Sequence, residues 1–279
     1  AELLAEKETD ESAAAIKNYI KWNDQYKKAC KLIYGKDAKL NDFKKAEQLL
    51  LSESQRGNVL AVYDLGKLYS TDKLGEKSEE ISIAKYTQAL QGFLQIEPNS
   101  KKLKPYVQYR IGKMFCYGLG TEQNYQKAFE WFERSAKQKN KFAQFSLANL
   151  YYYGSGIEKD LSQAFLWYQR SSSQGQPYAA YSIAQMYRYG EYVTKDNDTA
   201  QRYYKQALSG FLKIESDDMA NDDLFYKLGQ MFNLGLGTDS DVTKAIEYFR
   251  RSAEMNNKNG LFEYGKALLT GEHIPQDTD

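Results

Sequence analysis

The apolar positions of this chain recur at long, regular intervals, each as an apolar residue followed directly by a small one. Successive intervals are 46, 36, 36, 45 and 36 residues. Self-similarity at a period of about 20–50 residues is the signature of a repeat architecture. The dipeptides are Leu65-Gly66, Ile111-Gly112, Leu147-Ala148, Ile183-Ala184, Leu228-Gly229 and Tyr264-Gly265.

Other residue types recur at fixed distances from the small residue, and each set of equivalent positions across the repeats is called a column. An aromatic residue or Leu lies three positions after the small residue, a glycine six after it and, in the regular repeats, an alanine sixteen after it. The glycine ends one helix, and the Asn or Asp four positions before the alanine caps the next. Each unit therefore predicts a helix, a glycine turn and a second helix. The glycines are Gly118, Gly154, Gly190, Gly235 and Gly271, and the alanines are Ala128, Ala164, Ala200 and Ala245.

Some units depart from this pattern. The first repeat has Asp72 in place of the glycine and Ala84 at a longer spacing, and Tyr192 replaces a second turn glycine. The segment 88–97 recurs at 206–215, an offset of 118 residues, so the array reads as a duplicated triplet of one long and two short repeats. On the second helices we expect inward-facing aromatic pairs, including Trp131-Phe132 and Trp167-Tyr168.

The segment LANLYYYGSG at 147–156, followed by Asp160, Ala164 and Trp167-Tyr168, resembles the Sel1-like repeat, a relative of the tetratricopeptide repeat with a longer turn. The resemblance covers about residues 24–272. It implies an all-α, right-handed α-solenoid of about six to seven helix-turn-helix repeats, because stacked pairs bury a continuous core. We expect residues 1–22 to be a charged, helical lead-in and 23–279 a single solenoid whose last repeat is incomplete.

A narrower resemblance concerns the long second helices and the segment 112–136. Both look like the C-terminal array of mobilisation relaxases from mobile elements of Gram-positive bacteria. That resemblance implies an accessory module that contacts nucleic acid or a transfer complex, with the nicking domain upstream. The charged start, Ala1 to Asp10, looks internal to a longer polypeptide, so we expect a fragment.

Composition says more about the cellular compartment of the protein than about its binding partner. Lys plus Arg (38) balance Asp plus Glu (37), so net charge favours no partner class. Cys30 and Cys116 stand alone in different repeats, which predicts free thiols and a reducing, cytoplasmic bacterial setting. No stretch approaches the roughly 18 apolar residues of a membrane span. We expect no cofactor and no membrane association.

Two segments match sequence motifs of enzymes, but each is explained by its expected place in a turn or a helix. Ser70 to Lys73 fits S-x-x-K but lies where a polar turn is expected, and Gly260 to Lys266 imitates a P-loop inside an expected helix. The only histidine, His273, has no Cys or His cluster around it for a metal and no nucleophile beside it. We expect no catalytic and no metal site.

By resemblance to tetratricopeptide repeats, the first helices line a concave groove. Their exposed positions lie two before, two after and five after the apolar anchor. The first position is aromatic in every repeat, and the second is never acidic. Such a groove suits a peptide with acidic groups or a free carboxylate. The predicted partner-binding residues are Tyr109, Lys113, Phe145, Asn149, Tyr152, Tyr181, Gln185, Arg188 and Tyr226.

Three functions follow from these observations. The leading one is a non-catalytic scaffold or adaptor that binds a protein or peptide partner in the groove. The second is the relaxase accessory module, although nucleic-acid binders usually show a net-basic footprint that this chain lacks. The third is an enzyme with an unrecognised site. The sequence does not identify the partner.

Overall fold

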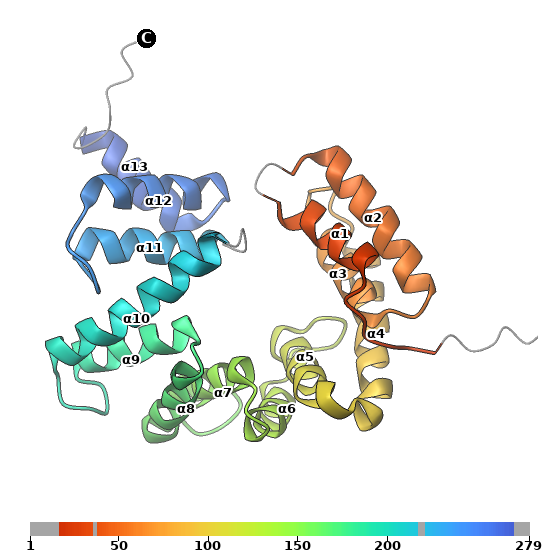
Figure 1. Cartoon of the computed structure of the whole chain (residues 1–279), viewed down its shortest axis with the longest axis horizontal. Helices are drawn as coiled ribbons and strands as arrows, with labels where there is room; N and C mark the ends of the chain where they lie inside the picture. Colours follow the sequence, from red (N-terminus) through yellow and green to blue (C-terminus); the bar gives the residue numbers. More distant parts are fainter. Residues whose placement is uncertain (1–16, 36–37, 217–220, 271–279) are drawn as a thin grey trace, which may run out of the picture. The chain divides into compact units, whose positions relative to one another are not determined.

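The structure, a computed structural model, describes residues 17–35, 38–216 and 221–270. Within these ranges it is all α-helical, apart from two 3-10 turns and one isolated bridge between Tyr19 and Asn58, as predicted (Figure 1). The α-helices are α1 (Asp24–Tyr34), α2 (Leu40–Gln55), α3 (Val59–Tyr69), α4 (Glu79–Ile96), α5 (Lys104–Tyr117), α6 (Tyr125–Lys137), α7 (Lys141–Tyr153), α8 (Leu161–Ser173), α9 (Pro177–Tyr189), α10 (Asn197–Ser216), α11 (Asp222–Leu234), α12 (Val242–Glu254) and α13 (Lys258–Thr270).

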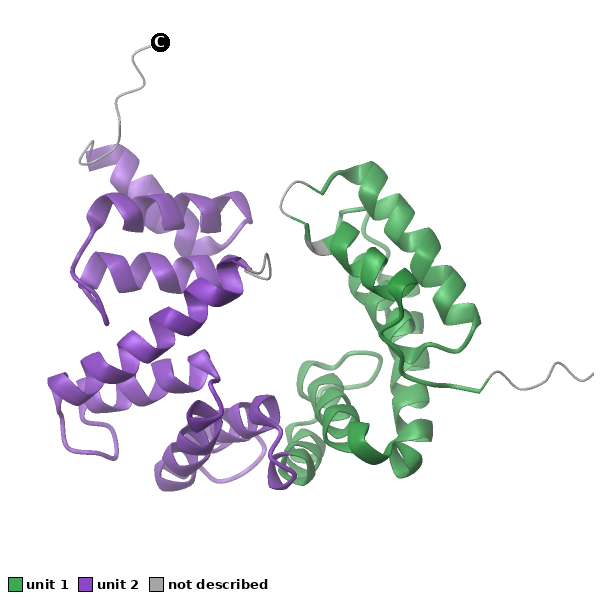
Figure 2. Cartoon of the chain, in the orientation of Figure 1, with its two compact units in different colours: residues 1–135 green, residues 136–279 purple. Residues whose placement is uncertain are grey.

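Consecutive helices pair as the repeat pattern predicts. The odd-numbered helix of each pair is called here the first helix and the even-numbered helix the second. Six pairs form, from α1 with α2 to α11 with α12. The next first helix, α13, packs on α12. The chain divides into two compact units, residues 1–135 and 136–279, which Figure 2 shows in separate colours.

The glycine turn has the geometry that its column predicts, as the turn between α7 and α8 illustrates. Gly154 takes a left-handed conformation (φ 69°), and its N–H donates to the carbonyl of Leu150. The N–H of Asp160 then donates to the carbonyl of Tyr151 at 3.0 Å, and the Asp160 carboxylate accepts from the N–H groups at the start of α8. These bonds satisfy several of the free groups at both helix ends, so neighbouring residues specify the turn.

The small residue of each first helix lets the second helix approach closely. A Cβ added at Gly112 would lie 2.6 Å from the Phe132 ring, and one added at Gly229 would lie 2.5 Å from Phe249. No side chain fits at such distances without displacing the ring. Close packing between the two helices therefore explains why this column holds only glycine and alanine.

Of the predicted aromatic pairs on the second helices, all members but two are buried. Trp167, Tyr168 and Phe132 are buried as predicted. Trp131 and Tyr203 are only half-buried. Arg134 and Arg170 each place a guanidinium over the tryptophan that lies three residues before it, at 4.8 and 4.5 Å from Trp131 and Trp167 respectively.

The lead-in segment is described from residue 17 onward. Residues 17–22 form no helix. Instead the N–H of Tyr19 donates to the carbonyl of Gly57 at 2.9 Å, and the carbonyl of Tyr19 accepts from the N–H of Val59 at 3.0 Å. Extended backbone therefore holds this segment against the turn between α2 and α3. The earlier part of the lead-in and His273 lie outside the described residues.

Candidate functional site

The aromatic column of the first helices is less exposed than the groove prediction requires. Tyr63 is buried, at 5% exposure, and Tyr109, Phe145, Tyr181 and Tyr226 are half-buried. Each ring packs against an aromatic ring of its own second helix. The ring centroids of the five pairs are 5.4–5.9 Å apart: Tyr63 with Tyr86, Tyr109 with Phe132, Phe145 with Tyr168, Tyr181 with Tyr204, and Tyr226 with Phe249.

In these five repeats the aromatic position is therefore less exposed than expected because the ring packs within its own repeat, whereas Phe262, at the same position of α13, is 70% exposed. The small residue three positions later brings the second helix so close that the ring at this position also packs on an aromatic ring of that helix.

Several polar residues that are predicted to bind another protein already form hydrogen bonds within the fold. The Tyr152 hydroxyl donates to Glu191 at 2.5 Å, and the Asn149 side-chain oxygen accepts from the Tyr168 hydroxyl at 2.6 Å. Gln230 donates to the Tyr226 hydroxyl at 2.9 Å. Removing the Tyr152 side chain would therefore also remove a hydrogen bond within the fold.

The predicted residues divide between the two units. Tyr109 and Lys113 belong to the first unit. In the second unit, both signs of charge lie near the predicted residues: Glu191 accepts from the Tyr152 hydroxyl, and the ammonium groups of Lys159 and Lys227 stand 5.6 and 5.7 Å from the rings of Tyr152 and Tyr181. The Arg188 guanidinium stands 5.5 Å from the Tyr189 ring. The second-unit residues are Phe145, Asn149, Tyr152, Tyr181, Gln185, Arg188 and Tyr226.

The first unit holds a denser cluster of charged and aromatic side chains, which we call the cation cluster: Lys67, Arg110 and Lys113 with Asp64, Tyr63, Tyr106 and Tyr26. It is built from the first helices α1, α3 and α5. The Tyr26 hydroxyl donates to the buried Asp64 carboxylate at 2.5 Å. The Arg110 guanidinium stands 4.8 Å from the centre of the Tyr63 ring and donates from Nε to the Tyr106 hydroxyl at 2.8 Å.

The cation cluster gathers three basic side chains and one carboxylate, and burial shifts their pKa values. Burial raises the pKa of Asp64, against the Tyr26 hydrogen bond and the charges of Arg110, Lys67 and Lys113. Burial, together with the like charges of Arg110 and Lys67, lowers the pKa of Lys113 to about 8. Burial also lowers the pKa of Lys67. Three basic side chains around one carboxylate therefore favour a bound anion, which would offset their mutual repulsion.

Sequence reasoning found Lys113 but missed Asp64 and Arg110. Both residues lie directly before the apolar anchor, a column that the repeat pattern leaves unassigned. Their opposite charges in successive repeats were the available signal. Only the packing of α5 on the preceding pair shows that they belong to one cluster, because the contact of Arg110 with Tyr63 crosses between repeats.

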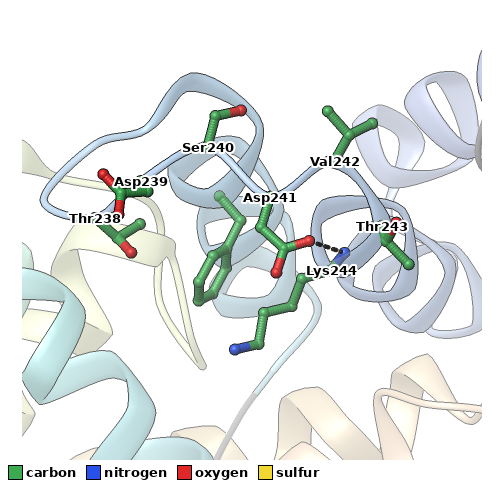
Figure 3. A pocket seen from close by; sticks show the side chains of 8 residues that line it. Thr238, Asp239, Ser240, Asp241, Val242, Thr243 and Lys244 are labelled. Atoms are coloured by element: carbon green, nitrogen blue, oxygen red, sulfur yellow. Dashed lines mark hydrogen bonds between the residues drawn. The ribbon is translucent and has the colours of Figure 1, made fainter.

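A surface hollow lies at the turn between α11 and α12 (Figure 3), and its polar groups serve the turn itself. The Asp241 carboxylate accepts from the Lys244 N–H at 3.0 Å, and the Ser240 hydroxyl donates to the Asn233 carbonyl at 3.0 Å. The Lys244 ammonium stands 4.6 Å from the centre of the Phe232 ring. We therefore assign no ligand to this hollow. Its lining residues are Phe232, Thr238, Asp239, Ser240, Asp241, Val242, Thr243 and Lys244.

The motifs that imitate enzyme sites occupy the positions expected of structural segments. Ser70 to Lys73 forms the turn after α3, and Gly260 to Lys266 lies within α13. Cys30 and Cys116 are free thiols, as predicted. Among the described residues, no helix combines the length and apolar character needed to cross a membrane.

Comparison with known proteins agrees with this architecture. The Sel1 repeat family matches residues 105–140, 141–176, 177–210 and 226–257. A Sel1 repeat protein from Oxalobacter formigenes shares 22% identity over 90% of this chain and 94% of its own, with a TM-score of 0.56. A Pseudomonas aeruginosa protein, 5086, shares 18% identity over 90% and 87%, with a TM-score of 0.53.

An immunity protein from Pseudomonas aeruginosa shares 18% identity over 92% of this chain and 90% of its own, with a TM-score of 0.51. A search of curated proteins finds no match. The narrower likeness to mobilisation relaxases gains no support from these comparisons. Proteins of the Sel1 type are typically non-catalytic scaffolds for protein interaction. The four matched repeats and the shared helix-turn-helix fold identify this chain as a member of the Sel1-repeat family.

Proposed function

We propose that this protein is a non-catalytic scaffold whose first-helix faces bind a peptide or protein partner that carries acidic groups. The proposed contact residues are Tyr109 and Lys113 in the first unit and Phe145, Asn149, Tyr152, Tyr181, Gln185, Arg188 and Tyr226 in the second. The observation that carries the proposal is the cation cluster, where Lys113 is half-buried among like charges.

Two further features support an anionic partner. The Tyr106 and Tyr63 rings flank Arg110 and orient its guanidinium, and a preorganised guanidinium loses less entropy when it binds a carboxylate. The half-buried tyrosines of the same helix faces offer rigid contact area around these charges. Aromatic and arginine side chains are the types that most often dominate binding energy at protein interfaces.

The test uses an acetylated, fluorescein-labelled hexaglutamate peptide, with a hexaserine peptide as its control. Saturable binding of hexaglutamate by the full chain, lost in Lys113→Met, would support the proposal. Lys127→Met is the matched control, because Lys127 is an exposed lysine on the second helix α6. Equal binding of both peptides, or loss of binding in the Lys127 variant alone, would refute the assignment of the site.

The same cluster could neutralise a nucleic-acid backbone, and salt separates the two partners. Binding to single-stranded nucleic acid falls with a log–log slope of about −0.7 for each phosphate neutralised. We would measure binding of a fluorescein-labelled oligothymidine at several salt concentrations. If it binds more tightly than hexaglutamate at physiological salt and shows such a slope, the partner is nucleic acid and not an acidic protein.

A further inference from the structure

The hydroxyl of Tyr204, on the second helix α10, is buried without a hydrogen-bond partner. Tyr204 is 1% exposed, and its ring packs on Tyr181 of the first helix α9 with the centroids 5.5 Å apart. Among the described residues, its hydroxyl oxygen is one of two buried side-chain polar atoms that bond to nothing. Such atoms are rare in folded proteins, so this hydroxyl calls for a physical explanation.

Packing does not require the Tyr204 hydroxyl. A buried polar group left unpaired costs stability. At the equivalent position α6 and α12 have phenylalanine, Phe132 and Phe249, and both rings are buried. In α8 the equivalent residue is Tyr168, whose hydroxyl donates to the Asn149 side-chain oxygen at 2.6 Å. Of these four positions, only Tyr204 has a hydroxyl without an acceptor.

The charged group beside this hydroxyl supplies donors and no acceptor. The Arg188 guanidinium, near the end of α9, lowers the pKa of Tyr204 against the larger rise caused by burial. A guanidinium carries only N–H donors, so it cannot accept the hydroxyl proton. Arg188 is half-buried, and it forms no ion pair within the part of the chain that the structure describes.

The acidic side chains of the neighbouring helix ends bond to other groups. Glu191 accepts from the Tyr152 hydroxyl at 2.5 Å, and Asp223 forms an ion pair with Lys227 at 3.0 Å. The surroundings of Tyr204 therefore combine a buried donor with a positive charge. A carboxylate satisfies both, because each of its two oxygens accepts a charge-assisted hydrogen bond.

We propose that Tyr204 and Arg188 together bind a carboxylate of the protein partner, with one oxygen accepting from the Tyr204 hydroxyl and the other from the Arg188 guanidinium. This inference rests on the proposed function, because it gives the acidic partner a second anchoring point, in the second unit. The half-buried Arg188 side chain is long enough to turn toward solvent and admit the carboxylate to the hydroxyl. An acidic side chain and a free C-terminus present the same two oxygens, so either can supply the carboxylate.

The probes are two fluorescein-labelled peptides, hexaglutamate with an amidated C-terminus and trialanine with a free C-terminal carboxylate. Trialanine amide is the uncharged blank. Tyr204→Phe removes only the hydroxyl, and we expect it to weaken binding of at least one probe about tenfold or more, because a hydrogen bond to a charged group is lost. Arg188→Met should weaken binding of the same probe. The probe that is affected identifies the source of the carboxylate.

Thermal melting separates a binding role of the hydroxyl from a structural one. Tyr204→Phe should keep or raise the melting temperature, because it removes a buried hydroxyl that has no partner. The matched control is Tyr248→Phe, since the Tyr248 hydroxyl donates to Glu215 at 2.8 Å. This control should lower the melting temperature and leave the binding of both probes unchanged.

Three results would overturn the inference. Tyr204→Phe binds both probes as the unchanged chain does, or it lowers the melting temperature as Tyr248→Phe does, which would show that the hydroxyl has a partner within the fold. In the third result neither probe binds the unchanged chain, and the proposed function then fails as well. Hexaglutamate binding that is lost in Lys113→Met but kept in Tyr204→Phe and Arg188→Met would overturn this inference alone.

Discussion

Titration of Lys113 offers a direct test of the anionic partner, because its pKa near 8 lies inside the range where the fold can be studied. Burial and the charges of Arg110 and Lys67 disfavour its protonated form, whereas a bound carboxylate favours that form. Binding therefore takes up a proton, and affinity falls as pH rises through about 8. If only protonated Lys113 binds, its protonated fraction falls about tenfold between pH 7 and pH 9, and so does the affinity.

The assay is fluorescence anisotropy with the labelled hexaglutamate peptide at constant ionic strength. The peptide carboxylates stay ionised throughout this range, so the protein supplies the titrating group. Lys113→Arg should bind with little change between pH 7 and pH 9, because an arginine remains charged. Lys113→Met should bind more weakly at pH 7 than the unchanged protein does at pH 9, because methionine has no protonated form. A pH dependence that persists in Lys113→Arg would refute the reasoning.

Four further outcomes test the packing. Trp167→Ala should lower the free energy of unfolding by roughly 3–5 kcal/mol, and Trp131→Ala by less because Trp131 is only half-buried, as measured by urea denaturation. Tyr26→Phe should cost about 1–3 kcal/mol by leaving Asp64 buried without its donor, which the same method can check. Gly229→Ala should destabilise the chain because its added Cβ meets the Phe249 ring. Gly265→Ala should instead stabilise the chain by about 0.5–1 kcal/mol, since alanine is the better helix former and its Cβ meets nothing there. Thermal melting should therefore show a lower melting temperature for Gly229→Ala and a higher one for Gly265→Ala. Gly154→Ala should cost about 1 kcal/mol or more because its φ of 69° disfavours a side chain, and a melting temperature equal to that of the unchanged chain would contradict this explanation of the turn.

The sequence by itself determined the fold class and the register of the repeats. Each turn is specified by a few neighbouring residues, such as Gly154 and Asp160, whose bonds join groups close in the chain. The close approach at Gly112 is likewise visible as a column of small residues. Capping and a helical apolar period act over a few residues, so pattern reading recovers them.

The functional surface depended on tertiary structure. The pattern identified Tyr109 and Lys113 as residues of one helix face, but it could not show that Tyr109 packs on Phe132 or that Lys113 shares its surroundings with Arg110 and Lys67. These contacts join residues from different helices. How far each side chain is covered depends on the offset between neighbouring helices, which a period along one helix does not specify.

The helix α13 shows that residues equivalent in the sequence can differ in burial. By sequence Gly265 belongs to the same column as Gly229, with an equal expectation of burial. The structure separates them, because Phe249 lies on Gly229 and nothing lies on Gly265. A repeat pattern determines which surface a helix can bury, and only the presence of a neighbouring helix decides whether that surface is buried.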